Sequence, residues 1–496
     1  WVLLQNTHLG LGYLTEVETF LIKEENIHED FRLWITAEPH PQFPIGLLQM
    51  GIKITNEAPV GMKAGLRASY QWVSQDMLDA VSHPYWRQLL FVMCFLHSVT
   101  QERRKFGPIG WCVPYDDFDQ LLMDTFAEKY FHPGVLAVGY ELYRDERSGF
   151  QYRVPDSNDI DVFRQSIELL PGTESPEVFG LHPNADVTFR TLQVQEAVYT
   201  ILDTMPKGGT AAGGLSREEI VDKICEDLLS KVPPMFDKEE TKEKLKKLPG
   251  GPTVPLTVHL RQELDRLNTI IRLATTTLKN LRLAIAGTIA LSGNLIEAVD
   301  ALFIARIPSF WLAKSWEATT LGNWFTGMLQ RYDQLNKWLN LGRPKGYWMT
   351  GFFNPQGFLT AMKQEVNRKH AADKWALDDV VMTSEVTNPP KDYEALKEAP
   401  AEGVYIYGLY LDGCAWSGRD NKLVDSEPKK LFNLMPVLYV TGVLAKDKKR
   451  TGVFEAPCYR VKTRKGLNFV TTFALRSEDD KSKWILRGVG ILCTID

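Results

Sequence analysis

Two amide side chains, Gln5 and Asn6, follow an apolar stretch at residues 1–4. A hydrolytic ATPase of the P-loop type carries two acids at the end of such a strand. One acid holds Mg²⁺ and the other orients the attacking water. Amides do neither job well, so this strand, if it belongs to a nucleotide module, cannot activate water. The same residues could also form any buried strand with a polar end, and both interpretations stay open here.

A glycine-rich segment at residues 208–214, GGTAAGG, resembles a phosphate-binding loop in its glycines alone. In that loop a lysine follows the second glycine of G-x-x-x-x-G, and here Gly214 stands in its place. We therefore interpret the segment as a flexible linker. The sequence also lacks H-E-x-x-H, G-x-S-x-G and the dinucleotide-binding glycine pattern. We expect no catalytic residue, no cofactor-binding residue and no metal site in this chain.

A second polar cluster, His97, Glu102, Arg103 and Arg104, follows an apolar helical stretch and could be taken for a catalytic site. Cations at the C-terminal end of a helix also simply complement the helix dipole. We favour that explanation, or an interface role for Arg103 and Arg104, over catalysis. His182, in the sequence GLHPNAD, is more typical of a turn or cap than of a metal ligand.

The composition is that of a globular protein with about two to four domains, since the chain has 496 residues, of which 44% are hydrophobic and 24% are charged. Its 57 lysines and arginines and 62 acids give a net charge of −5, which provides no reason to expect nucleic acid as a partner. The six cysteines form no C-x-x-C pair and favour a reducing cytosol. The longest apolar run, residues 89–96, is too short to span a membrane. The first residue is Trp within a strand pattern, so we expect the chain to begin partway through a fold.

The elements that must position Gln5 and Asn6 follow a strand, helix, strand order. The apolar spacing predicts a helix over residues 9–23 and a second buried strand over 31–36, closed by a run of prolines. This order indicates a parallel α/β unit. Residues 45–57 add one further helix or strand, after which strand signals become sparse. The α/β part is therefore half a domain.

The middle of the chain is mainly helical. Its 3.6-residue periodicity predicts helices over 68–79, 86–104, 117–130, 160–169, 189–205 and 217–231. From Leu260 to Leu302, apolar or small residues recur at spacings of four and three, as in a coiled coil. Gly287 and Gly293 interrupt this seam, so a bent helix or two helices packed within the chain is favoured over a free dimer zipper.

Beyond Trp375 the periodicity changes to two. It predicts strands over 380–386, 404–411, 437–443, 458–462, 469–475 and 484–493. Six short strands indicate an antiparallel barrel or sandwich. The aromatic run at 347–358 has no basic surround, so it favours tight packing, with Gly351 and Gly357 permitting close backbone approach.

Seven segments of the sequence, in this order, closely resemble the C-terminal end of dynein heavy chains. They are WVLLQNTHLGLGYL, FRLWITAEPHPQFPIGLLQMGIKITNEAP, FLHSVTQERRKFGPIGW, EVFGLHPNADVTF, RIPSFWLAKSW, LGNWFTGMLQR and TGFFNPQGFLTAM. The resemblance covers essentially the whole chain. The region from ARIPSFW to FNPQGFLTAM is most similar to axonemal outer-arm heavy chains.

The resemblance implies a multidomain α/β, α and β architecture. It places the later half of the sixth AAA+ module at 1–67, its helical lid at 68–207, a linker with connecting helices at 208–252, the helical part of a C-terminal domain at 253–374 and an antiparallel β-barrel at 375–496. In that family the sixth module lacks a working ATP site. Gln5 and Asn6 would then be a degenerate Walker-B-like position, and Thr36 a degenerate sensor-like position.

The resemblance also implies a function without catalysis in this segment. The chain would close and stiffen a motor ring whose ATP, ADP and Mg sites lie upstream, and would couple ATP-driven change to microtubule-based ciliary movement. Its partners would be the rest of the ring, other heavy chains, and intermediate and light chains. Microtubules would be contacted through a stalk elsewhere, in the cytoplasm and cytoskeleton of a cilium or flagellum. No nucleic acid and no membrane are expected.

Two departures from the family pattern stand out. Family members carry an additional helical stretch where Tyr115 here runs straight into Asp116, and a shorter gap of the same kind lies near Gly466. A different class of function also stays open, namely a free-standing helical scaffold that dimerises through residues 260–302.

Overall fold

The computed structural model describes residues 1–24, 26–40, 42–55, 59–110, 117–204, 216–448, 451–464 and 468–495. The chain divides into two compact units, Trp1–Pro59 and Val60–Asp496, and each is described by itself. The glycine-rich segment at 208–214 and the two joins, at 115–116 and at Gly466, lie outside the described residues.

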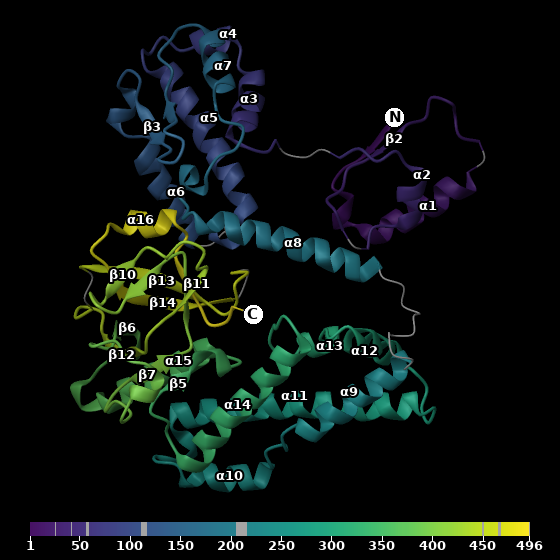
Figure 1. Cartoon of the computed structure of the whole chain (residues 1–496), viewed down its shortest axis with the longest axis vertical. Helices are drawn as coiled ribbons and strands as arrows, with labels where there is room; N and C mark the ends of the chain where they lie inside the picture. Colours follow the sequence, from purple (N-terminus) through teal and green to yellow (C-terminus); the bar gives the residue numbers. More distant parts are fainter. Residues whose placement is uncertain are drawn as a thin grey trace. The chain divides into compact units, whose positions relative to one another are not determined.

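The first unit contains a two-stranded parallel sheet and two helices (Figure 1). Strand β1 (Val2–Leu4) pairs in parallel with β2 (Leu33–Ile35), and α1 (Leu11–Lys23) connects them. Helix α2 (Ile45–Met50) follows. The predicted strand, helix, strand order with a parallel pair is therefore confirmed, but the predicted burial of the two strands is wrong, since Leu3 is 54% and Trp34 is 45% exposed.

The first part of the second unit is helical, as predicted. Its helices are α3 (Met62–Trp72), α4 (Gln75–Asp79), α5 (Trp86–Arg103), α6 (Asp117–Tyr130), α7 (Ile160–Glu168) and α8 (Asn184–Thr204). The single helix predicted over 68–79 is two helices, because the Ser74 side chain accepts a bond from the Met77 backbone N–H and starts α4 anew. The pattern missed a hairpin of β3 (Glu141–Arg144) and β4 (Gln151–Arg153), whose strands are too short for a clear alternation.

The next part consists of helices packed around one long helix, α11 (Pro255–Ile285), as Figure 1 shows. The others are α9 (Arg217–Lys231), α10 (Lys238–Lys247), α12 (Gly293–Phe303), α13 (Ser309–Leu312), α14 (Leu321–Leu341) and α15 (Pro355–Lys369). Helix α11 contacts α9, α12, α14 and α15. The Leu260 to Leu302 seam is thus two helices separated by a break, and its apolar residues pack within the chain, as expected.

The last part is rich in strands, which lie mainly in two sheets. A four-stranded sheet has the order β5 (Tyr347–Trp348), β7 (Val404–Tyr407), β12 (Leu438–Leu444), β6 (Val380–Val386). A five-stranded sheet has the order β11 (Phe432–Leu434), β8 (Tyr410–Asp412), β15 (Gly490–Leu492), β13 (Val453–Tyr459), β14 (Phe469–Arg476). A small pair joins β9 (Ala415–Ser417) to β10 (Lys422–Val424).

The predicted antiparallel barrel is wrong in two respects. Among the described strands no sheet closes on itself, and the pairs β5·β7 and β13·β15 are parallel. The sheet edges β6 and β14 meet through a side chain: Ser384 Oγ accepts from the Ala474 N–H at 2.7 Å and donates to the Ala474 carbonyl at 3.2 Å. A side-chain link replaces the backbone ladder that a closed barrel requires.

The strand predicted over 484–493 is also half wrong. Its first part belongs to helix α16 (Lys481–Leu486), because the carboxylate of Asp480 caps the helix by accepting from the Ser482 N–H at 2.8 Å. Only its end forms β15. In the part of the chain that the structure describes, no helix is long and apolar enough to cross a membrane.

Candidate functional site

The ends of β1 and β2 bring the degenerate nucleotide positions together. The parallel register Leu4↔Ile35 places Asn6 and Thr36 at the same end of the pair. The Asn6 N–H donates to Thr36 Oγ1 at 3.0 Å, and the Thr7 N–H donates to the Thr36 carbonyl at 3.0 Å. Sequence reasoning named Asn6 and Thr36 separately, and the structure makes them neighbours.

The chemistry available at this strand end is neutral. Asn6 has φ 53° and ψ 42°, a left-handed conformation that Asn tolerates better than most residues. Both Gln5 and Asn6 are exposed. Amides and a hydroxyl can orient a polar group, but they supply neither a carboxylate for Mg²⁺ nor a base for water. Within the described ranges, no group of three or more His, Cys, Asp or Glu side chains is arranged to hold a metal ion.

Arg103, by contrast, is completely buried in the second unit. Its side chain donates to three backbone carbonyls: Nε to Gly110 at 2.9 Å, and Nη1 to Phe179 at 2.5 Å and to Leu486 at 2.8 Å. The guanidinium carbon also lies 5.4 Å from the ring centre of Phe126. Arg103 therefore links α5 to the end of α16, a segment 383 residues further along the chain.

The electrostatics of Arg103 follow from this burial. Desolvation lowers the pKa of the guanidinium to about 9, although nearby Tyr130 and Asp119 favour its charged form. The three carbonyl acceptors satisfy Nε and Nη1, whereas the buried Nη2 has no hydrogen-bond partner among the described residues and so costs free energy. Arg104, the next residue, is exposed. A contact of Arg103 or Arg104 with another module stays a prediction.

Asn184 provides a second link to the C-terminal part, which the sequence reasoning missed. Its Nδ2 donates to the carbonyls of Glu427 and Lys430, both at 3.0 Å, and its Oδ1 accepts from the Lys429 N–H at 2.7 Å. The Asn184 N–H in turn donates to His182 Nδ1 at 3.2 Å, so the predicted turn or cap at His182 is confirmed. No local sequence signal indicates this link, because the Asn184 side chain binds a segment more than 240 residues away.

Glycine allows the same two segments to approach closely. Gly488 has φ 64°, and a Cβ on it would lie 2.0 Å from the carbonyl oxygen of Ile109. No side chain fits there, so the turn between α16 and β15 lies directly against the chain that follows α5. Helix α16 also packs on α6. Together, Arg103, Asn184 and Gly488 define what we call the lid interface.

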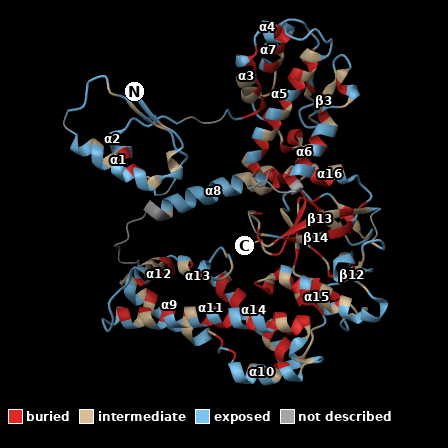
Figure 2. Ribbon diagram, turned by 180° about the vertical axis from the view of Figure 1, so that it is seen from behind, coloured by how far each residue is buried: buried red, intermediate tan, exposed pale blue. Residues whose placement is uncertain are grey.

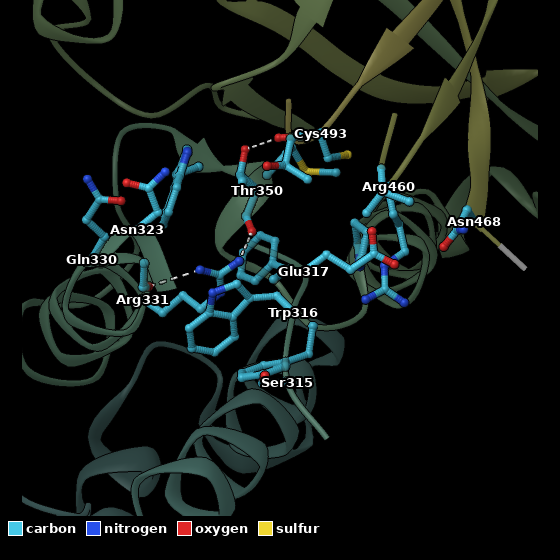
Figure 3. Close-up of a pocket in the computed structure, with 18 of the residues that line it drawn as sticks. Ser315, Trp316, Glu317, Asn323, Gln330, Arg331, Thr350, Arg460, Asn468 and Cys493 are labelled. Carbon is cyan, nitrogen blue, oxygen red and sulfur yellow. Dashed lines mark hydrogen bonds between the residues drawn. The ribbon is translucent and has the colours of Figure 1, made fainter. Parts of the chain in front are cut away.

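A pocket of about 400 Å³ lies near the end of β15 (Figure 3). Arg331 stacks on Trp316, with 3.9 Å between the guanidinium carbon and the ring centre, and donates through Nη2 to the Thr350 carbonyl at 2.8 Å. The Thr350 hydroxyl donates to the Cys493 carbonyl. The aromatic run that sequence reasoning assigned to packing forms one wall, and Tyr347 and its neighbours are buried as expected.

Comparison of the sequence with known protein families finds models of a single family along most of the chain. Family profiles match the dynein heavy chain region D6 P-loop domain at residues 1–55, the AAA lid domain of dynein heavy chains at 86–116 and 116–185, and the C-terminal domain of dynein heavy chains at 191–493. The chain therefore belongs to the dynein heavy chain family. The two lid matches meet at residue 116, where additional family residues were expected.

Individual relatives sharpen this assignment. The chain is 72% identical to the dynein gamma chain of the flagellar outer arm from Chlamydomonas reinhardtii, and 41% identical to the mouse dynein axonemal heavy chain 5. It is 32% identical to the Dynein-1-alpha heavy chain of the flagellar inner arm I1 complex from Chlamydomonas reinhardtii. Each comparison covers 100% of this chain but 11% to 12% of the relative, so the chain spans about an eighth of their length.

Proposed function

We propose that this chain acts as a non-catalytic C-terminal segment of an axonemal outer-arm dynein heavy chain. In this role it closes the AAA+ motor ring and couples ATP-driven change at upstream sites to microtubule-based movement of a cilium or flagellum. The observation that carries the proposal is the neutral strand end at Gln5, Asn6 and Thr36, inside a segment that matches the sixth-module profile. The identity to the Chlamydomonas outer-arm gamma chain supports the choice of arm.

The proposed partners follow from the same assignment. They are the remainder of the AAA+ ring, other heavy chains, and intermediate and light chains of the arm. Microtubules are contacted through the stalk of the parent motor, within the cytoplasm and axonemal cytoskeleton. ATP, ADP and Mg belong to the upstream modules. The scaffold alternative is less well supported, because the seam that it would use is buried against other helices of the same chain.

Coupling requires rigid contacts between the lid and the C-terminal domain, and the lid interface supplies them. Arg103 and Asn184 each hold backbone carbonyls of the distant segment, so a shift of the lid helices is transmitted to the C-terminal sheet. Side chains that bind backbone carbonyls are insensitive to the identity of the residues that they hold. The polar part of the link therefore depends on the Arg103 and Asn184 side chains themselves.

A measurement of nucleotide binding by the 496-residue chain tests the proposal that this segment is not catalytic. We expect no saturable Mg-ATP binding in equilibrium dialysis and no turnover. A Gln5→Asp, Asn6→Glu variant restores acids at the strand end, yet it should also fail to hydrolyse ATP, because the sequence has no lysine-bearing phosphate loop. Saturable binding with turnover in either protein would contradict the proposal.

A motility assay with the complete heavy chain tests the proposal that this segment couples ATP turnover to movement. Asn184→Ala should lower the velocity of microtubule gliding severalfold, while ATP turnover without microtubules continues. Arg190→Ala is the matched control, since Arg190 lies on the same helix, is exposed, and pairs with Asp186 at 2.9 Å. Equal velocities for the two variants would remove the lid interface from the coupling path.

A further inference from the structure

Two cysteines lie close together in the five-stranded sheet. Cys458 is in β13, and Cys493 directly follows β15, the strand that pairs with β13 in parallel. The register sets Cys458 opposite Ile491, so Cys493, two residues further on, belongs to the same face of the sheet. Their sulfur atoms are 3.9 Å apart. Both side chains are buried, with 0% and 3% of their surface exposed.

Cys493 is one of the residues that line the pocket of Figure 3, so we take this pocket as the route of access to the pair. Arg331 and Arg460 line the same pocket, and Glu317 carries the one carboxylate among its described lining residues. The charge of the lining therefore favours small anionic molecules. The bond from the Thr350 hydroxyl to the Cys493 carbonyl holds the backbone at the inner end.

We propose that Cys458 and Cys493 are a dithiol that a small anionic disulfide, such as glutathione disulfide, converts into an internal disulfide. The sulfurs need to approach from 3.9 Å to about 2.05 Å, which side-chain rotation and a small backbone shift provide. Each of the other described cysteines, Cys94, Cys225 and Cys414, is a buried free thiol. Nothing in the proposed ring function requires this pair.

The reaction proceeds by two thiol–disulfide exchanges. Deprotonated Cys493, the residue at the pocket, attacks one sulfur of glutathione disulfide, which breaks that S–S bond and releases one glutathione thiolate. Cys458 then attacks Cys493 Sγ and releases the second glutathione. The protein loses two electrons and two protons, and the oxidant becomes two thiols. Burial raises the pKa of the Cys458 thiol, which disfavours Cys458 as the thiol that attacks free glutathione disulfide in the first step.

The new bond would tie β15 to β13 at the edge of the lid interface. The stretch from the last residue of α16 to β15 carries the Leu486 and Gly488 carbonyls, which accept from Arg103 and Arg464, both at 2.8 Å. Separation of the end of β15 from β13 would then require the disulfide to break. Oxidation is thereby linked to the rigidity of the contact between lid and sheet.

Peptide mapping of the native chain tests the proposal. The folded protein is treated with glutathione disulfide, its remaining thiols are alkylated in urea, and the digest is analysed by mass spectrometry. We expect one linked pair of peptides, containing Cys458 and Cys493, with the other four cysteines alkylated. Either Cys458→Ala or Cys493→Ala should abolish the link, whereas Cys225→Ala should retain it.

The wild-type measurement does not depend on any variant folding. Glutathione attached to Cys493 as the final product, full alkylation of all six cysteines, or a disulfide that includes another cysteine would each overturn the proposal.

A second readout follows from the loop that the disulfide closes. The oxidised chain should melt several degrees above the reduced chain, and that difference should vanish in Cys493→Ala. An equal melting temperature for oxidised and reduced wild-type protein would remove the effect on rigidity.

Discussion

The two compact units differ in how much apolar surface they bury. In the described part of Trp1–Pro59 the buried apolar side chains are Leu14 and Leu47, whereas Trp1 is 85% and Ile52 is 94% exposed. The second unit contains a continuous core through its helices and sheets. Figure 2 shows the contrast, with pale blue dominating the first unit and red running through the second.

This difference shows that a segment can have the predicted order and pairing of its strands and helices without burying enough surface to be stable. A two-stranded sheet with two helices orders the strand ends correctly, but it buries too little surface to be stable by itself in water. In the second unit, long-range contacts among helices and sheets supply the stability. The nucleotide-like geometry at Asn6 and Thr36 thus lies on a weak scaffold, and the lid interface lies on a strong one.

Truncation of matched leucines should give the largest contrast. Leu267, in α11, is completely buried, and Leu3, in β1, is 54% exposed. We expect Leu267→Ala to lower the free energy of unfolding by about 3 to 4 kcal/mol, because it leaves a cavity among packed helices. Leu3→Ala should cost less than about 1 kcal/mol. Urea unfolding of the whole chain measures both changes in the free energy of unfolding. Similar losses for the two variants would contradict the contrast between the two units.

Replacement of the buried arginine should come next in size. Arg103→Met leaves the carbonyls of Gly110, Phe179 and Leu486 without their donor, so we expect a loss of about 3 kcal/mol in urea unfolding. Arg104→Met is the matched control, because that neighbouring side chain is exposed, and it should change stability by less than about 0.5 kcal/mol. If both variants were equally stable, the polar link between α5 and α16 would not be part of the strong scaffold.

These arginines also show where sequence reasoning reaches its limit. Helices α6 and α9 were predicted to the residue, because periodicity and caps such as Ser216 act within a few residues. The contact of Arg103 with Leu486 spans most of the chain and leaves no local trace. The same holds for the parallel pairing of β15 with β13, which no alternation pattern specifies. For the first site, Gln5 and Asn6 could be named from the strand pattern because a strand end is a local feature, whereas Thr36 was named only through the family resemblance.

A buried histidine should give the second unit a pH dependence. His259 packs on Phe352 and Phe358, with ring centres 5.1 Å and 5.6 Å away, and burial, with a contribution from Arg266, lowers its pKa to about 4. The unfolded chain, with a histidine pKa of about 6.5, binds a proton first, so stability is present above pH 6.5 and is lost as the pH falls to 4. The shift of the His259 pKa alone corresponds to a loss of about 3 kcal/mol in the free energy of unfolding.

The measured loss should be smaller than that figure, because the Glu263 carboxylate lies 3.8 Å from His259 and favours the protonated form. Thermal unfolding between pH 7 and 4 should therefore show a decline that His259→Leu reduces. His28→Leu, at an exposed position of the first unit, is the control and should leave the decline unchanged. If the His259→Leu variant lost as much thermal stability between pH 7 and 4 as the wild-type chain, other titratable groups would be responsible for the pH dependence.

The smallest effect should appear at the end of the parallel pair in the first unit. Thr36→Val removes the hydroxyl that accepts from the Asn6 N–H, and the exposed site allows water to replace it. We expect hydrogen exchange of the Asn6 amide to quicken by about threefold. The Thr7 amide donates to the Thr36 backbone carbonyl, which the substitution leaves in place, so its exchange should stay constant. If hydrogen exchange of both amides quickened equally, β1 and β2 would be separating as a whole. The pairing of the strand ends would then depend on the Thr36 hydroxyl rather than on the backbone hydrogen bonds between the strands.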